Sequence, residues 1–145
     1  MRPRTPAEYL EKAKIKGGGM MRRISSGSVF EAQIGYSRAV VQGGLVYVSG
    51  TTGYDYASMT LPGDVEAQCA NTLATIAKVL EEAGSSLDQV VRVRYILPDR
   101  RDFPKCWPQL SAAFARARPA ATMIEARLME DAMKIEIEVT AVCGE

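Results

Sequence analysis

Hydrophobic and polar residues alternate over several stretches of the chain, which is the pattern of β-strands that bury one face. The clearest stretch covers residues 133–142, and further β-rich runs cover 36–41, 45–49, 90–97 and 121–128. Gly43-Gly44 separates two of these runs and predicts a tight hairpin. The pattern also allows a short strand over residues 22–26.

The alternation predicts which side chains of two strands are buried. In residues 133–142 the predicted buried side chains are Ile135, Ile137, Val139 and Ala141, with Glu136, Glu138 and Thr140 on the other face. In residues 90–97 they are Val91, Val93, Tyr95 and Leu97, with Val90, Arg92, Arg94 and Ile96 on the other face.

Two helices are predicted where apolar residues recur at steps of three and four. The first covers residues 64–83 and ends at Gly84. The second carries one apolar stripe made of Phe103, Trp107, Leu110 and Phe114. Pro104 and Pro108 are expected to delay its start or to bend it.

A capping box at Thr5-Pro6-Ala7-Glu8 predicts a further helix that ends near Ile15. Gly17-Gly18-Gly19 follows it as a linker. We therefore predict an N-terminal extension over residues 1–19 and one domain over residues 20–145. The order of strands and helices in this domain predicts an α+β fold with two helices on one face of a sheet. The other face is expected to meet water or another subunit.

Composition limits the classes of function. The chain has 145 residues, of which 47% are hydrophobic and 24% charged, as in an ordinary soluble domain. It has no run of about 20 apolar residues, so we expect no membrane association. It also has no histidine, which excludes Ser-His-Asp and Cys-His nucleophilic sites and histidine-containing zinc sites. Three isolated cysteines without a CxxC pair favour a reduced, cytoplasmic setting and no metal site.

Charge is distributed unevenly. Residues 1–24 contain seven Lys/Arg and two Asp/Glu, and the rest of the chain is mildly acidic. Such a basic segment can contact RNA, but it is more often a solvated terminus. A second basic cluster, made of Arg92, Arg94, Arg100 and Arg101, allows the same two interpretations.

Few residues stand out as candidates for chemistry. Glu136 and Glu138 share a strand face, and paired carboxylates can act as general acid and base, although their spacing also fits a solvated face. Small residues at Ser49-Gly50-Thr51-Thr52-Gly53 let a ligand approach the backbone, or form a simple turn. Cys69 and Cys106 lie on apolar helix faces and are predicted to be core residues. No phosphate-binding glycine motif is present.

Five motifs in this order and spacing resemble the YjgF/RidA family, also called endoribonuclease L-PSP. They are Gly35-Tyr36-Ser37-Arg38-Ala39-Val40, Val48-Ser49-Gly50, Asp102-Phe103, Arg118-Pro119-Ala120 and Lys134-Ile135-Glu136-Ile137-Glu138. The resemblance covers about residues 22–143. It implies a chorismate-mutase-like fold, with a mostly antiparallel mixed sheet, assembled as a homotrimer with ligand clefts between subunits.

The family's best-known activity is the hydrolysis of reactive enamines and imines to a keto acid and ammonia, without metal or organic cofactor. By resemblance, Tyr36, Ser49 and Gly50 line the cleft and Glu136 holds or activates the attacking water. Met123 corresponds to a position whose backbone hydrogen-bonds the ligand.

This sequence differs from the family at one important position. Imine-hydrolysing members carry an arginine two residues after the proline, where it clamps the substrate carboxylate. Here that position is Ala121. Arg118, or an arginine of a neighbouring subunit, could replace the clamp, but a surface position for Arg118 is the simpler expectation. We therefore expect a cleft that accepts a neutral or differently charged small molecule, with Thr122 donating a hydrogen bond.

The sequence leaves three hypotheses open. The first is a trimer that binds a carbonyl- or imine-type ligand and hydrolyses or tautomerises it, using Glu136. The second is a non-catalytic, small-molecule-binding or chaperone-like trimer. The third is an RNA-binding or RNA-cleaving protein.

Overall fold

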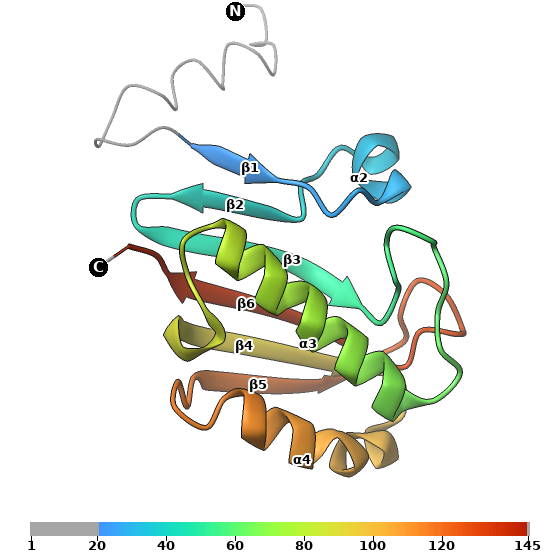
Figure 1. Cartoon of the computed structure of the whole chain (residues 1–145). Coiled ribbons are helices and arrows are strands. Elements are labelled where there is room, and N and C mark those ends of the chain that lie inside the picture. The colour runs from blue at the N-terminus through green and yellow to red at the C-terminus, as the bar shows by residue number, and fades with distance from the viewer. Residues whose placement is uncertain (1–20, 145) are drawn as a thin grey trace, which may run out of the picture.

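The computed structural model describes residues 21–144 (Figure 1). The elements in chain order are β1 (Arg22–Ile24), α2 (Val29–Ile34), β2 (Ala39–Gln42), β3 (Leu45–Thr52), α3 (Val65–Glu82), β4 (Val90–Leu97), α4 (Phe103–Ala113), β5 (Ala120–Glu125) and β6 (Glu136–Val142). Single 3-10 turns at Leu87–Gln89 and Arg100–Asp102 precede β4 and α4. The predicted helix from Thr5 to Ile15 and the predicted extension 1–19 lie outside the described residues.

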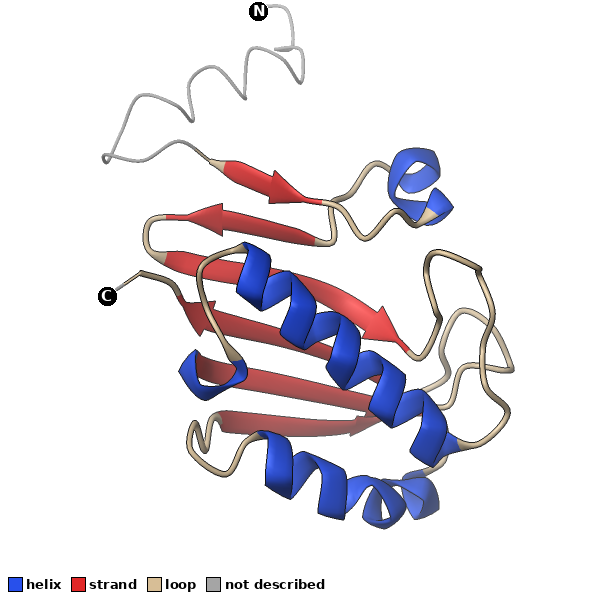
Figure 2. Ribbon diagram, viewed as in Figure 1, coloured by secondary structure: helices blue, strands red, loops and turns tan. Residues whose placement is uncertain are grey.

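The strands form one six-stranded sheet in the order β1-β2-β3-β6-β4-β5. Every neighbouring pair is antiparallel except β4 and β5, which are parallel. Helices α3 and α4 lie side by side on one face of this sheet (Figure 2). The predicted α+β architecture, a mixed sheet with two helices on one face, is confirmed.

One cluster of buried apolar side chains fills the space between the helices and the sheet. Ile76 and Leu80 of α3 and Ile135 and Ile137 of the 133–142 stretch are completely buried there. Burial of each such side chain contributes about 1.5–3 kcal/mol. The predicted buried face of residues 133–142 is therefore confirmed, although β6 itself begins only at Glu136.

The predicted faces of β4 are wrong at its first two residues, Val90 and Val91. Val90 pairs with Ala141 and Arg92 pairs with Thr140, so Val91 is an extra residue in the strand. Such a bulge interrupts the alternation. As a result Val90 is 2% exposed and lies in the core, whereas Val91 is 47% exposed.

The apolar stripe of α4 is also shifted from its prediction. Cys106 and Leu110 are the buried residues within the helix, whereas Trp107 is 55% exposed and its ring packs against that of Phe103 in a T-shaped arrangement. The helix starts at Phe103, with Pro104 in its first turn, where a missing N–H costs no helical hydrogen bond. Of the two expected effects of the prolines, the late start is therefore not observed, and Pro108 lies inside the helix.

Helix α2 has no counterpart among the predicted elements. The hydroxyl of Ser28 accepts a hydrogen bond from the Phe30 N–H at 3.2 Å, and Gly35 ends the helix with a φ of +90°. Ser28 followed by Glu31, with a glycine after one and a half turns, is a helix signal that the sequence analysis missed.

The other local predictions differ only at their ends. The short strand near residue 22 and the hairpin at Gly43-Gly44 are confirmed, and both glycines have positive φ. Strand β5 ends at Glu125, three residues earlier than predicted. No helix within residues 21–144 has both the length and the hydropathy needed to cross a membrane.

Candidate functional site

Arg38 lies just before β2, and its guanidinium is buried at one end of the sheet, with the residue 1% exposed. Its Nη1 donates to the carbonyl oxygen of Gly50 at 2.8 Å and to Oγ1 of Thr51 at 3.2 Å. Its Nη2 donates to the hydroxyl of Tyr36 at 3.3 Å, and its Nε donates to Oγ of Ser26 at 3.2 Å. One side chain thus connects two of the family motifs, residues 35–40 and 48–50.

Two aromatic rings and one carboxylate complete the surroundings of Arg38. The guanidinium carbon is 4.5 Å from the ring centre of Tyr56 and 5.5 Å from that of Tyr36. Glu31 of α2 accepts hydrogen bonds from the backbone N–H of Arg38 at 3.2 Å and from the Ser26 hydroxyl at 2.6 Å. Burial acts to raise the pKa of Glu31, but the Ser26 hydrogen bonds and the Arg38 charge outweigh it, so this pKa is lowered.

Glu136, the first residue of β6, is half-buried against Gly50 of β3. A Cβ atom added to Gly50 would lie 2.5 Å from Oε1 of Glu136, so the carboxylate rests directly on the glycine. Burial raises the pKa of Glu136, the neighbouring Glu138 raises it further, and the charge of Arg38 opposes both. A carboxylate with a raised pKa holds a proton more readily than a solvated one, as a group that takes and returns protons requires.

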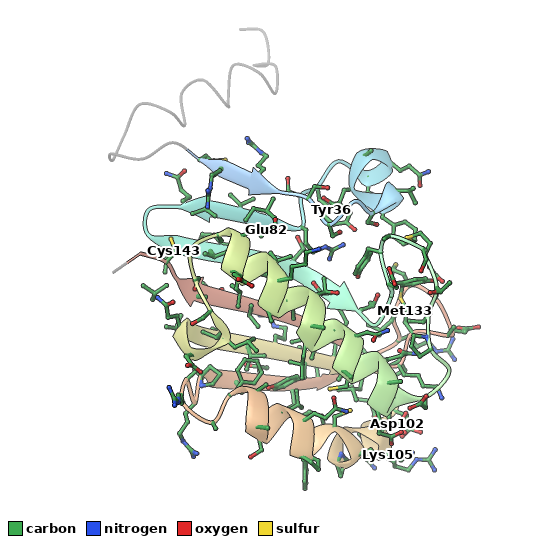
Figure 3. The ribbon with its side chains drawn as sticks, viewed as in Figure 1. Tyr36, Glu82, Asp102, Lys105, Met133 and Cys143 are labelled. Atoms are coloured by element: carbon green, nitrogen blue, oxygen red, sulfur yellow. The ribbon has the colours of Figure 1, made fainter. Side chains whose placement is uncertain are left out.

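Ser49 lies beside this group, at a register shift between β3 and β6. Its hydroxyl donates to the carbonyl oxygen of Ser37 at 2.6 Å, so its proton is already used within the chain. The oxygen of Ser49 remains an acceptor. Tyr36, Ser49, Gly50 and Glu136 are therefore brought to one end of the sheet (Tyr36 is labelled in Figure 3).

Two surface loops lie at the same end of the sheet. The hydroxyl of Tyr54 donates to Glu130 at 2.6 Å, which joins the segment after β3 to the segment before β6 (Figure 1). This hydrogen bond, together with burial, raises the pKa of Tyr54.

The remaining predicted site residues lie on or near β5, at the other edge of the sheet. Ala121 and Met123 line an apolar hollow of about 360 Å³ together with Val93, Tyr95, Phe103, Trp107, Leu110, Ser111, Phe114 and Pro119. Arg118 is exposed in the loop after α4, with a φ of +42°. Residues 121 and 123 are thus on the helix side of the sheet.

Thr122 lies on the opposite face of β5 from Ala121. It pairs with Arg94, which forms an ion pair with Glu138 at 2.8 Å on the open face. The hydroxyl oxygen of Thr122 accepts a hydrogen bond from Arg92 at 3.2 Å. Within one chain, Thr122 and Ala121 therefore cannot contact the same face of a ligand, and neither adjoins Glu136 in the sheet.

The predicted basic cluster is partly neutralised. Arg94 is paired with Glu138, and Arg101 is paired with Asp99 at 2.8 Å. The bidentate contact with Arg101 lowers the pKa of Asp99 to about 2. This pairing leaves less positive charge for a nucleic acid than the sequence suggests.

Cys69 and Cys106 are completely buried free thiols, as predicted for core residues. The interaction with Cys106, together with burial, raises the pKa of Cys69, which disfavours the thiolate that a nucleophile needs. No cluster of three or more metal-ligating side chains occurs among residues 21–144.

Sequence reasoning missed Arg38 and the aromatic pair Phe103 and Trp107 as parts of the candidate site. Arg38 lies inside the first family motif, and its positive charge is the signal that could have identified it as a site residue. The roles of Tyr36, Ser49, Gly50, Arg118, Ala121, Thr122, Met123 and Glu136 in ligand binding or catalysis remain predictions.

We expect Gly50→Ala to displace the Glu136 side chain while preserving the fold, because the atom it meets is the end of a flexible side chain. The carboxyl ¹³C signal of Glu136 should move, and the melting temperature should fall by only about 2–4 °C. Gly63→Ala, which has open space around it, is the matched control. An unchanged Glu136 signal would contradict this placement.

Comparison with known proteins shows to which family this chain is related. The family model described as Endoribonuclease L-PSP matches residues 27–143. A 2-iminobutanoate/2-iminopropanoate deaminase of Capra hircus is 33% identical over 127 residues, covering 86% of this chain and 93% of the relative. A RutC family protein of Pyrococcus abyssi is 33% identical over 107 residues, covering 73% and 84%.

Solved structures show the same relationship. A YjgF/YER057c/UK114 family member from Mycobacterium tuberculosis superposes with a TM-score of 0.76 at 36% identity, covering 84% of this chain and 98% of its own. RidA from Psychrobacter gives a TM-score of 0.73 at 28% identity, covering 83% and 97%. The chorismate-mutase-like fold expected from the sequence is that of these neighbours. The chain belongs to the YjgF/RidA family, the family described as endoribonuclease L-PSP.

Proposed function

We propose that this protein hydrolyses an imine or enamine to a carbonyl compound and ammonia, without a cofactor, in clefts between the subunits of a homotrimer. The observation that carries the proposal is the half-buried Glu136 carboxylate, held on Gly50 beside Tyr36 and Arg38. Relatives at about one-third identity that are named imine deaminases support it.

The proposed chemistry assigns one proton carrier. Glu136 takes a proton from water as the water oxygen bonds to the imine carbon, and it returns that proton to nitrogen to give a carbinolamine. It then takes the proton of the carbinolamine hydroxyl and delivers it to nitrogen as the carbonyl forms and the C–N bond breaks. Water and imine thereby yield a carbonyl compound and ammonia. The raised pKa of Glu136 supports this role, because a carboxyl group titrating closer to neutrality both accepts and returns protons effectively.

We propose a substrate without a carboxylate next to the imine. Ala121 brings neither a charge nor a side-chain donor, and the hollow that it lines is bordered by Met123, Phe103 and Trp107. Such a surface favours an apolar group and leaves a carboxylate without a partner. An uncharged, partly apolar imine therefore fits better than an imino acid.

The separation of the two groups within one chain supports an assembly of subunits. Glu136 and the Ala121 hollow lie on different strands, and the hollow is on the helix side of β5. Strand β5 is an edge strand, with most of its residues exposed. We propose that a second chain packs against this edge and brings its own Glu136 group to the hollow.

The test is ammonia release from freshly generated 2-iminopropanoate and from an uncharged aryl ketimine. We expect the wild-type protein to favour the uncharged imine and Ala121→Arg to gain roughly 10²-fold on 2-iminopropanoate, because a charge-assisted pair then binds the carboxylate. Ala120→Arg, with the same charge on the opposite face, is the matched control.

A wild-type preference for 2-iminopropanoate would contradict the proposed substrate class. If neither imine is hydrolysed by the wild-type protein or by Ala121→Arg, the hydrolase itself is contradicted. Ligand-induced shifts in melting temperature without product would then support the non-catalytic binding hypothesis.

A further inference from the structure

The buried guanidinium of Arg38 is the polar group of this region that the proposed reaction does not use. Among residues 21–144, no carboxylate lies within salt-bridge distance of it, and its hydrogen bonds go to neutral oxygen atoms. Burying a cation without an ionic partner costs several kcal/mol, so its retention calls for a compensating role. The two tyrosine rings offset part of this cost through cation–π contact.

The first consequence of this placement concerns Tyr36. A guanidinium has donors only, so the Tyr36 oxygen must be the acceptor in their 3.3 Å hydrogen bond. The phenolic proton is therefore left for a different acceptor. Within the described part of the chain, the Tyr36 hydroxyl has no other hydrogen-bond partner, so its proton is available to a ligand.

The second consequence concerns Glu136. Arg38 binds the carbonyl oxygen of Gly50, and the carboxylate of Glu136 rests on the same glycine. The sheet neighbours of Glu136 are Thr52 and Ile96, which carry no charge. The charged groups acting on it are Glu138 on its own strand and Arg38 across Gly50.

We propose that Arg38 is the positioning residue of this site: it presents the Tyr36 hydroxyl as a proton donor to the ligand and supplies the fixed positive charge that balances the Glu136 carboxylate. The fixed positive charge of the cleft therefore lies at Arg38, just before β2, and not on β5, where Ala121 carries no charge. The Arg38 guanidinium makes its hydrogen bonds within the protein, so it orients neighbouring groups and does not bind a substrate carboxylate. The inference rests on the proposed function for the identity of the reaction.

The proposed effect of the Arg38 charge on Glu136 is tested without any substrate, by a ¹³C NMR titration of the Glu136 carboxyl group in the full chain. Arg38→Gln should raise the pKa of Glu136 above the wild-type value, because the opposing charge is lost. Arg38→Lys should keep it close to wild type, because the charge is retained. A titration that is the same in Arg38→Gln and wild type would overturn this part of the proposal.

The orientation of Tyr36 is tested by a double-mutant cycle on the imine that the wild-type protein hydrolyses. Tyr36→Phe is expected to lower kcat roughly 10²-fold, as the loss of one preorganised donor does. Arg38→Lys should lower kcat at least about tenfold, and the double variant should be no slower than Tyr36→Phe alone. Additive effects would overturn the proposed coupling.

These outcomes separate the inference from the proposed function. If the wild-type protein hydrolyses no imine, the proposed function fails while the NMR titration still decides the charge role. If Arg38→Gln does not fold, the ¹³Cζ signal of Tyr36 in Arg38→Lys provides the second measurement. That signal should move when the hydrogen bond from Arg38 is lost, and an unmoved signal would overturn the positioning role.

Discussion

Replacing Glu136 by glutamine is expected to lower the kcat of imine hydrolysis about 10²–10⁴-fold, because the amide cannot carry the proton between water and nitrogen. The substitution conserves shape, so the packing on Gly50 should remain. Steady-state ammonia release on the preferred imine measures the effect. Retention of most of the activity would show that Glu136 does not carry the proton.

Glu138→Gln is the matched control for this substitution. Glu138 lies two residues further along the same strand face, but its carboxylate is paired with Arg94. Its loss should leave kcat within about threefold of wild type, since surface ion pairs contribute little. Equal losses in both variants would indicate a general effect of charge on that face.

The Glu136→Gln variant should also differ from wild type in how its stability depends on pH. Because burial raises the pKa of Glu136 in the folded state, the ionised carboxylate destabilises the fold at pH values above that pKa. This penalty disappears as the pH falls below the unfolded value of about 4.5. Glu136→Gln should therefore gain stability relative to wild type as the pH rises from about 4 to 7. Chemical denaturation at several pH values measures this change, and a loss instead of a gain would contradict the direction.

Gly53→Ala is expected to produce the largest loss of stability, about 3 kcal/mol, or roughly 10 °C in melting temperature. A Cβ atom at this position would lie 2.5 Å from both Cα and Cβ of Gln68, inside helix α3. These atoms belong to a helix packed in the core and cannot move aside. The substitution must therefore separate β3 from α3.

Gln68 makes this contact especially sensitive. Its buried side chain donates to the carbonyl oxygens of Pro62 and Ala132 at 2.7 and 2.9 Å and accepts from the Lys134 N–H at 2.8 Å. Moving Gln68 therefore disturbs the loop before α3 and the segment that leads into Glu136. Thermal unfolding compares the variant with Gly63→Ala, a control that meets no atoms and should change stability by less than about 0.5 kcal/mol. Equal stability of the two variants would contradict the close packing at Gly53.

Much of the fold was predictable because periodicity is a local property. The buried face of β6, the helix ended by Gly84 and the hairpin at Gly43-Gly44 each depend on residues close together in the chain. The wrong predictions occur where the pattern of buried and exposed residues along an element shifts by one residue. The bulge at Val91 moves Val90 into the core, and the helical phase of α4 leaves Trp107 exposed.

The candidate site shows where sequence and tertiary structure contribute separately. The sequence by itself determined the absence of histidine, the family motifs, the polar strand face that carries Glu136 and the alanine at position 121. Only the tertiary structure decided that Gly50 lies beneath Glu136, that Arg38 joins Tyr36 to Gly50, and that Ala121 faces a hollow on the helix side. The contact between Gly50 and Glu136 joins segments far apart in the chain, so it depends on strand order and register. A shift of one residue in register changes which face a side chain takes, and no local pattern encodes which strands become neighbours.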